Sequence, residues 1–204
     1  MGLAACVIKP SELRPLSDAG LLLFAARCAM RIETWCPPGT SRFWADGLSV
    51  ALSAARGVAV DRKKAIALRR NISDRGAVAC NDLESSDEPL GRCMNYATGA
   101  LALAIDAALT PKRAVRVEIL QAAAKHAGSI PAILAHAGRV RAKPGEDPVD
   151  VACLAIWNAM RSDIPRLAES ESSLLASKSP MRAVAAVGPL WPGRAPAWAR
   201  RRRA

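Results

Sequence analysis

Arginine and tryptophan occur together near the end of the sequence, and this pairing could do chemistry on a phosphate backbone. Trp191 and Trp198 stand among Arg194 and the run Arg200 to Arg203. Guanidinium groups pair with phosphates, and indole rings stack on unpaired bases. The stretch 178–204 carries seven positive charges and no negative one. We therefore expect this segment to attract polyanions, nucleic acid first and anionic lipid second.

The positive charge is local. The whole chain holds 29 Lys and Arg against 18 Asp and Glu. The seven basic residues after position 177 leave 22 for residues 1–177, which contain all 18 acidic ones. The alternative is that the basic segment is a solvent-exposed end of the chain with no specific role.

A second basic cluster lies in the middle of the chain. Arg62 and Lys63 precede Arg69 and Arg70 by seven residues, so on a helix the two pairs share one exposed side, away from Leu68 and Ile72. Such a side is either a contact surface for phosphates or simply a solvated face. The predicted nucleic-acid-binding residues are Arg62, Lys63, Arg69, Arg70, Arg194, Trp198, Arg200, Arg201, Arg202 and Arg203.

Other chemistry finds little support in the residue spacing. No two of the six cysteines are separated by the two to four residues with which one turn grips zinc. His126 and His136 lie ten apart, which does not place them on one helix face. Glu33 has an arginine two residues before it and is expected to form a structural ion pair. We predict no metal, no cofactor, no small-molecule substrate and no catalytic activity.

The elements that must position these residues are helices. Apolar residues make up 51% of the chain and aromatic residues 4%, and alanine is abundant, which favours helix and close helix packing. No alternating run of Val, Ile, Thr and aromatic residues predicts a strand. Apolar stripes and cap residues predict about six helices, over residues 17–35, 41–56, 61–83, 90–108, 110–127 with a continuation to 140, and 148–167.

Several boundaries follow from proline and glycine. Thr110 followed by Pro111 predicts the start of the fifth helix, and the sequence from Gly128 to Pro131 predicts a break or kink within it. From Glu169 onward the sequence becomes rich in Ser and then in Gly, Pro and Arg, which is typical of irregular chain. We therefore predict an all-α helical domain over residues 1–168 and a flexible, disordered basic tail over 169–204.

Cellular location is predicted from what the sequence lacks. No window approaches the roughly 20 apolar residues that span a bilayer, because Arg27 interrupts the longest candidate. The six cysteines are interpreted as free thiols in a reducing cytoplasm, since no export signal precedes them.

Two stretches resemble a known group of proteins. LLLFAARCAMRIETW, residues 21–35, followed by Trp44 and by RCMNYATGALALAI, residues 92–105, resembles the helical repeats of uncharacterised Ala/Arg-rich bacterial proteins. Some of those all-helical proteins are similar to immunity proteins, which bind and neutralise toxins. The resemblance covers about a quarter of the chain and assigns no functional residue. It implies a bacterial, cytoplasmic, helical binding protein.

The sequence therefore predicts a non-catalytic helical accessory subunit. It would contact RNA or DNA phosphates, without reading bases, inside a nucleoprotein assembly that contains other protein subunits. The alternative is a protein-binding module of the immunity or adaptor kind, in which the basic tail is incidental. An enzyme of unknown reaction is the third hypothesis.

Overall fold

The computed structural model describes residues 7–176, 187–191 and 193–200. Their regular secondary structure is entirely helical, which confirms the all-α fold class and the expected six main helices. The main helices are α1 (Asp18–Arg31), α2 (Ser41–Ala55), α3 (Arg62–Asp82), α4 (Glu88–Leu109), α5 (Arg113–His136) and α6 (Pro148–Ala176). Three 3-10 turns accompany them: η2 (Pro10–Leu13), η3 (Glu33–Trp35) and η4 (Ala197–Ala199).

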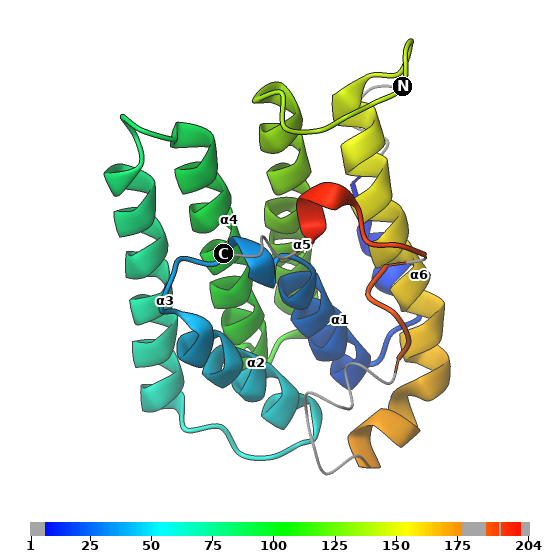
Figure 1. Cartoon of the computed structure of the whole chain (residues 1–204). Helices are drawn as coiled ribbons and strands as arrows, with labels where there is room; N and C mark the ends of the chain where they lie inside the picture. Colours follow the sequence, from blue (N-terminus) through cyan, green and yellow to red (C-terminus); the bar gives the residue numbers. More distant parts are fainter. Residues whose placement is uncertain (1–6, 177–186, 192, 201–204) are drawn as a thin grey trace.

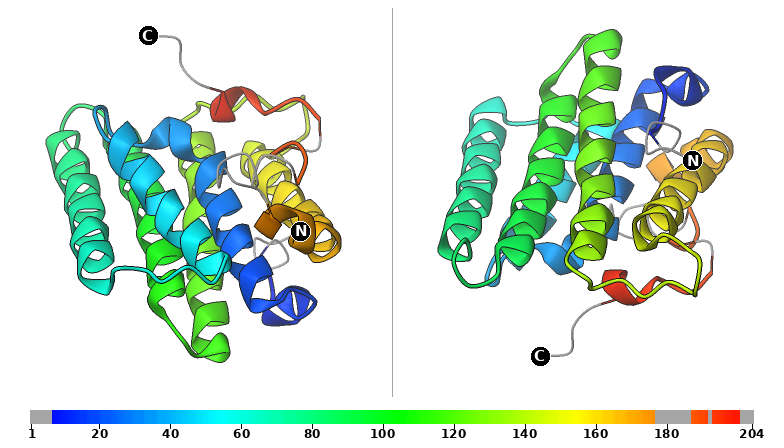
Figure 2. Two further views of the ribbon diagram at one scale, coloured as in Figure 1. Left: turned by 90° about the horizontal axis from the view of Figure 1, so that it is seen from below. Right: turned by 90° about the horizontal axis from the view of Figure 1, so that it is seen from above.

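Helix α1 is the centre of the molecule. It contacts α2, α4, α5 and α6, and all but three of its residues are buried. Helix α3 lies at one edge, where it packs on α4 and more lightly on α2 (Figure 1). Figure 2 shows α3 and α6 on opposite sides of the bundle in both of its views. The core is built mainly from alanine and leucine, so the helices approach each other closely.

Side-chain caps start three of the helices where the sequence predicts them. Ser17 accepts a hydrogen bond from the Gly20 amide at 3.0 Å at the start of α1. Asp61 and Asp87 do the same for α3 and α4, each at 3.1 Å. These caps satisfy amides that have no partner inside the helix.

Helix α5 differs from the prediction at both of its expected landmarks. Thr110 ends α4 instead of starting α5, because its hydroxyl donates to the Asp106 carbonyl oxygen at 2.7 Å, and α5 begins at Arg113. Of the break or kink predicted between Gly128 and Pro131, a break is not found, since α5 continues to His136 with Pro131 buried inside it.

Tertiary packing explains this continuity. The indole of Trp157, on α6, packs directly against Gly128, where any side chain would collide with it. The close approach of α6 therefore covers the segment in which glycine and proline weaken the helix on their own.

Helix α6 starts as predicted, with Asp147 accepting from the Val149 amide at 2.7 Å. Its end is different, because the helix passes through Pro165 and continues to Ala176. The predicted boundary after residue 168 therefore falls inside a helix.

Two findings bear on location and redox state. Of the helices in the described part of the chain, none is long and apolar enough to cross a membrane. No disulfide joins any two of the described cysteines, which are Cys28, Cys36, Cys80, Cys93 and Cys153, and Cys6 lies outside the described residues.

Candidate nucleic-acid interface

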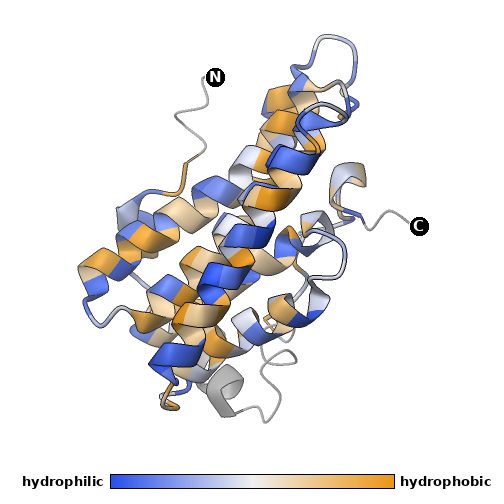
Figure 3. Ribbon diagram, turned by 90° about the vertical axis from the view of Figure 1, so that its left-hand side faces the viewer, coloured by the Kyte–Doolittle hydropathy of each residue, from blue (hydrophilic) through white to orange (hydrophobic). Residues whose placement is uncertain are grey.

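The outer side of α3 carries the exposed cations of the predicted middle cluster. At about 100° per residue, Arg62, Lys63, Ile66, Arg69 and Arg70 fall within an arc of roughly 120°. All of them are exposed except Arg69, which is half-buried. Figure 3 looks onto this edge of the molecule and shows hydrophilic stretches alternating with apolar ones along the front helix. We call these five residues the α3 basic face.

Local ion pairs on α3 are long and solvated. Lys64 lies 3.6 Å from Asp61, and the side chains are 88% and 52% exposed. Arg70 lies 4.0 Å from Asp74 in a similarly exposed pair. Exposed pairs of this kind hold their partners weakly, so both cations remain available to a phosphate.

Arg69 has a different role from its neighbours. It forms a fork with Asp106 on α4, through Nε and Nη2 at 3.1 to 3.2 Å. A bidentate guanidinium–carboxylate pair fixes geometry as well as charge. Arg69 therefore ties α3 to α4, and Arg62, Lys63 and Arg70 are the exposed cations of the α3 basic face.

The described residues 187–191 and 193–200, which we call the C-terminal segment, are packed onto the helices. Val187, Trp191 and Trp198 are each less than 9% exposed. The two indoles form an edge-to-face pair, with ring centroids 5.4 Å apart and planes 89° apart. Within the tail predicted for 169–204, these apolar side chains pack against the helices, whereas residues 177–186, 192 and 201–204 lie outside the described residues. Figure 1 shows the C-terminal segment running beside α5 and α6.

A buried charge cluster holds this segment in place. Arg27 donates from Nε to Asp163 Oδ2 at 2.7 Å and from Nη2 to Oδ1 at 2.8 Å. Arg31 donates from Nη2 to the same Oδ2 at 2.5 Å. Both guanidiniums and the carboxylate are fully buried, so one carboxylate on α6 serves two arginines on α1.

Backbone carbonyl oxygens of the C-terminal segment also accept from the two arginines, although Nη1 of Arg31 is buried without a hydrogen-bond partner among the described residues. Arg27 also donates to the oxygens of Gly188 and Pro189 at 3.1 to 3.2 Å. Arg31 donates from Nε to the Leu190 oxygen at 2.8 Å. Since a buried charge is costly unless it is fully hydrogen-bonded, these carbonyls are structural partners of the two arginines.

The structure thus separates the predicted site residues into two groups. The α3 basic face and the C-terminal segment lie on different sides of the bundle (Figure 2). Trp198 is buried against Trp191, so its ring is not exposed to stack on a base in this conformation, and its assignment to the site stays a prediction. Arg194 and Arg200 are exposed, and Arg201, Arg202 and Arg203 lie outside the described residues.

Arg27, Arg31 and Asp163 were missed by the sequence reasoning, although a signal was present. Arginines four residues apart interrupt an otherwise apolar helix, so both must face the same neighbour. Asp163 stands three residues after Met160 and four before Leu167, which places it on the apolar stripe of α6. Charges inside apolar stripes of two helices predict a buried ion pair between them.

The described residues offer little for catalysis or metal binding. No group of three His, Cys, Asp or Glu side chains in this part of the chain could hold a metal ion. The one fully buried carboxylate in it, Asp163, is occupied by two guanidiniums. Burial raises the pKa of the Cys28 thiol to about 12, despite the opposing charge of nearby Arg31, which disfavours a nucleophilic thiolate.

Comparisons with known proteins give no further assignment: no family model, no curated protein and no solved structure matches the chain.

Proposed function

We propose that the protein is a non-catalytic helical accessory subunit that contacts nucleic-acid phosphates through the α3 basic face. The observation that carries this proposal is the exposure of Arg62, Lys63 and Arg70 on one side of an edge helix. Exposed cations of this kind pair with phosphate oxygens, and such contacts position a protein on nucleic acid without reading bases. The assembly would contain other protein subunits.

The position of these cations within α3 supports the proposal. The first turn of α3 contains no acidic residue, and Arg62 and Lys63 are its first two positions. Helix N-termini carry a partial positive charge and favour carboxylates there. Placing cations at that end works against helix stability and raises the local positive potential, which is what an anion-binding surface requires.

The test uses substitution in the full chain. The variant Arg62→Gln/Lys63→Gln/Arg70→Gln is compared with a matched control, Lys112→Gln/Lys125→Gln/Arg141→Gln, which removes three exposed cations from α5 and the connections on either side of it. Both variants have the same net charge. Fluorescence anisotropy with labelled single- and double-stranded RNA and DNA, over a salt series, measures binding.

We expect the α3 variant to bind more weakly to every sequence, with the slope of log K against log salt reduced by about 2 to 3. The control variant should keep most of the affinity. Equal losses in the two variants would mean that only net charge matters, and the proposal would be rejected. Deleting the C-terminal segment is unsuitable here, because it also strips partners from Arg27 and Arg31.

One observation favours a second candidate, a protein-binding adaptor. Ile66 lies at the centre of the α3 basic face and is 49% exposed, and Val78 on the same helix is 57% exposed. Apolar side chains among cations suit an acidic protein partner better than a phosphate backbone. Ile66→Ser separates the two candidates, since it leaves the charges intact: it should weaken an adaptor complex and leave the salt-dependent binding of nucleic acid unchanged.

A further inference from the structure

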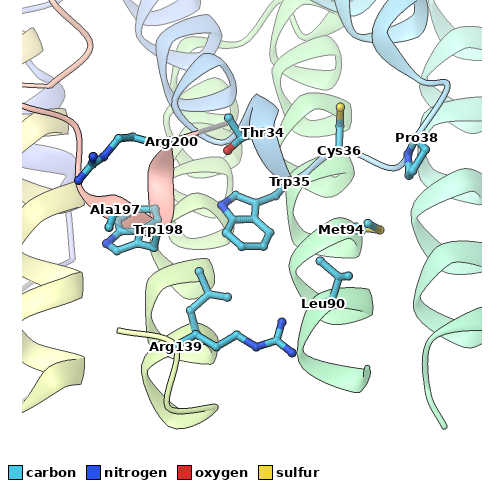
Figure 4. A pocket seen from close by; sticks show the side chains of 11 residues that line it. Thr34, Trp35, Cys36, Pro38, Leu90, Met94, Arg139, Ala197, Trp198 and Arg200 are labelled. Carbon is cyan, nitrogen blue, oxygen red and sulfur yellow. The ribbon is translucent and has the colours of Figure 1, made fainter. Parts of the chain in front are cut away.

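A cavity of about 380 Å³ opens beside the C-terminal segment, far from the α3 basic face. Its walls come from four parts of the chain: η3 and the turn after it, α4, the end of α5 with Arg139, and η4. Eleven residues line it, and Figure 4 labels ten of them. It exists only because the C-terminal segment is packed on the bundle, since Ala197, Trp198 and Arg200 form one wall.

The body of the cavity is apolar. Trp35 and Trp198 provide two aromatic walls, and Leu90, Met94 and Leu134 close the space between the helices. Figure 4 shows Trp35 between Trp198 on one side and Met94 on the other. Pockets of this size with aromatic and aliphatic walls are typical of sites for small organic molecules.

The polar side chains that line the cavity are mostly donors. The indole N–H groups of Trp35 and Trp198 are buried, and neither has a hydrogen-bond partner among the described residues. Both tryptophans are more than nine-tenths buried. Each indole nitrogen has almost no accessible surface, so these two donors lie behind the cavity wall and the tryptophans present mainly ring carbon to the cavity.

Two arginines add positive charge. Arg139 reaches in below Trp35, and Arg200 lies beside Trp198 (Figure 4). Asp87 accepts from Arg139 at 2.8 Å, but only through Nη2. Nε and Nη1 of Arg139 make no hydrogen bond to a described residue, so the ion pair orients the guanidinium and leaves these donors for a ligand.

None of the lining residues carries a carboxylate. An apolar body with two arginines at its edges is complementary to a small molecule with an apolar part and an anionic head. We propose that the cavity binds a small amphipathic carboxylate, with its apolar part between Trp35 and Met94 and its head group paired with Arg139. This inference is independent of the α3 basic face.

The experiment compares three probes with the full-length chain by titration calorimetry: octanoate, octanol and octyltrimethylammonium. They share an apolar chain and differ in the charge of the head group. Octanoate should bind saturably, octanol at least tenfold more weakly, and octyltrimethylammonium not at all. Equal affinity for octanoate and octanol, or no saturable binding of octanoate, would overturn the proposal.

Two variants locate the site. Arg139→Gln should weaken octanoate binding at least tenfold, while the matched control Arg92→Gln should not change it. Arg92 also pairs with a carboxylate of α4, at 3.3 Å from Glu88, but does not line the cavity. If both variants bind octanoate like the original chain, the head group is not held by Arg139 and the assignment is wrong.

A third variant guards against an effect of Arg139→Gln on folding. Met94→Trp fills the cavity and leaves the Arg139–Asp87 pair intact, so octanoate binding should be lost while the thermal melting curve stays cooperative. Undiminished binding to Met94→Trp would reject the cavity.

A direct readout on the original chain is the indole N–H region of a proton–nitrogen correlation spectrum, where the chain's five tryptophans give five signals. Octanoate should shift the signals of Trp35 and Trp198 and leave that of Trp157 unchanged.

Discussion

At the scale of single residues, the most deeply buried ion pairs of the described chain join Arg27 and Arg31 to one carboxylate, that of Asp163. Asp163→Asn keeps the shape of the side chain and removes its charge, which leaves Arg27 and Arg31 buried with carbonyl partners and no counter-ion from α6. We expect a loss of about 3 to 5 kcal/mol in the free energy of unfolding, measured by urea denaturation.

Asp106→Asn is the matched control for that prediction. Its partner Arg69 is 43% exposed, so water can replace the lost charge, and the expected loss is about 1 kcal/mol or less. If both substitutions cost the same, burial does not set the strength of these pairs and the account of the cluster is wrong.

Thiol reactivity gives a second test at this scale. Burial raises the pKa of both Cys28 and Cys93 to about 12, so at pH 8 only about one molecule in ten thousand carries either thiolate. Cys36 and Cys80 are half-buried. Peptide mapping after iodoacetamide treatment of the native protein should find Cys80 modified and Cys28 and Cys93 intact until urea is added. Modification of Cys28 at the rate of Cys80 would contradict the packing of α1.

At the scale of the helices, Gly128 shows how packing reverses a local preference. In an exposed helix, Gly→Ala is stabilising by about 1 kcal/mol, because alanine favours helix. At Gly128 the added methyl group would collide with the indole of Trp157, so Gly128→Ala should instead destabilise the protein by about 1 to 3 kcal/mol.

Ser129→Ala, at the neighbouring position, tests whether the effect belongs to α5 in general. The Ser129 hydroxyl only donates to the Lys125 carbonyl oxygen of its own helix, so a change within about 0.5 kcal/mol is expected from thermal or urea unfolding. A stabilising Gly128→Ala would show that α5 and α6 are farther apart than the structure has them.

The sequence predicted the helices best where a periodic stripe and a cap agree. Ser17, Asp61 and Asp147 mark helix starts that the structure confirms. The errors occur where the deciding contact is remote in sequence. Pro131 and Pro165 weaken their helices locally, but both helices continue. No local pattern reveals that Trp157 of α6 packs against α5 at Gly128, close to Pro131.

The candidate site was predictable only in part, for the same reason. Exposure of Arg62, Lys63 and Arg70 follows from their spacing alone. The engagement of Arg69 depends on Asp106, which lies 37 residues away. The composition of the C-terminal segment predicts disorder, because no local pattern shows that Val187, Trp191 and Trp198 pack against helices far away in the sequence.

At the scale of the whole molecule, the C-terminal segment is part of the folded structure. A chain that ends at Ala176 would lose the Gly188 and Pro189 carbonyl partners of Arg27 and the Leu190 partner of Arg31, which would keep Ala159, and it would expose the surface under Trp191 and Trp198. We expect its free energy of unfolding to fall by about 3 kcal/mol or more, because hydrogen bonds to charged groups contribute about 1.5 to 3 kcal/mol each. Equal urea midpoints for the two chains would mean that this segment is a solvated appendage after all.

The link between Arg27 and Gly188 also affects how the protein is made. The two residues are 161 positions apart, so at a synthesis rate of about 5 to 20 residues per second the carbonyl partner appears some 8 to 32 seconds after the arginine. During that interval α1 can form a helix and pack against its apolar neighbours, while the guanidinium groups of Arg27 and Arg31 remain hydrated. Burial of these two charges therefore waits for the C-terminal segment, which is made much later. We expect nascent chains that lack this segment to be the form most exposed to chaperones and proteases.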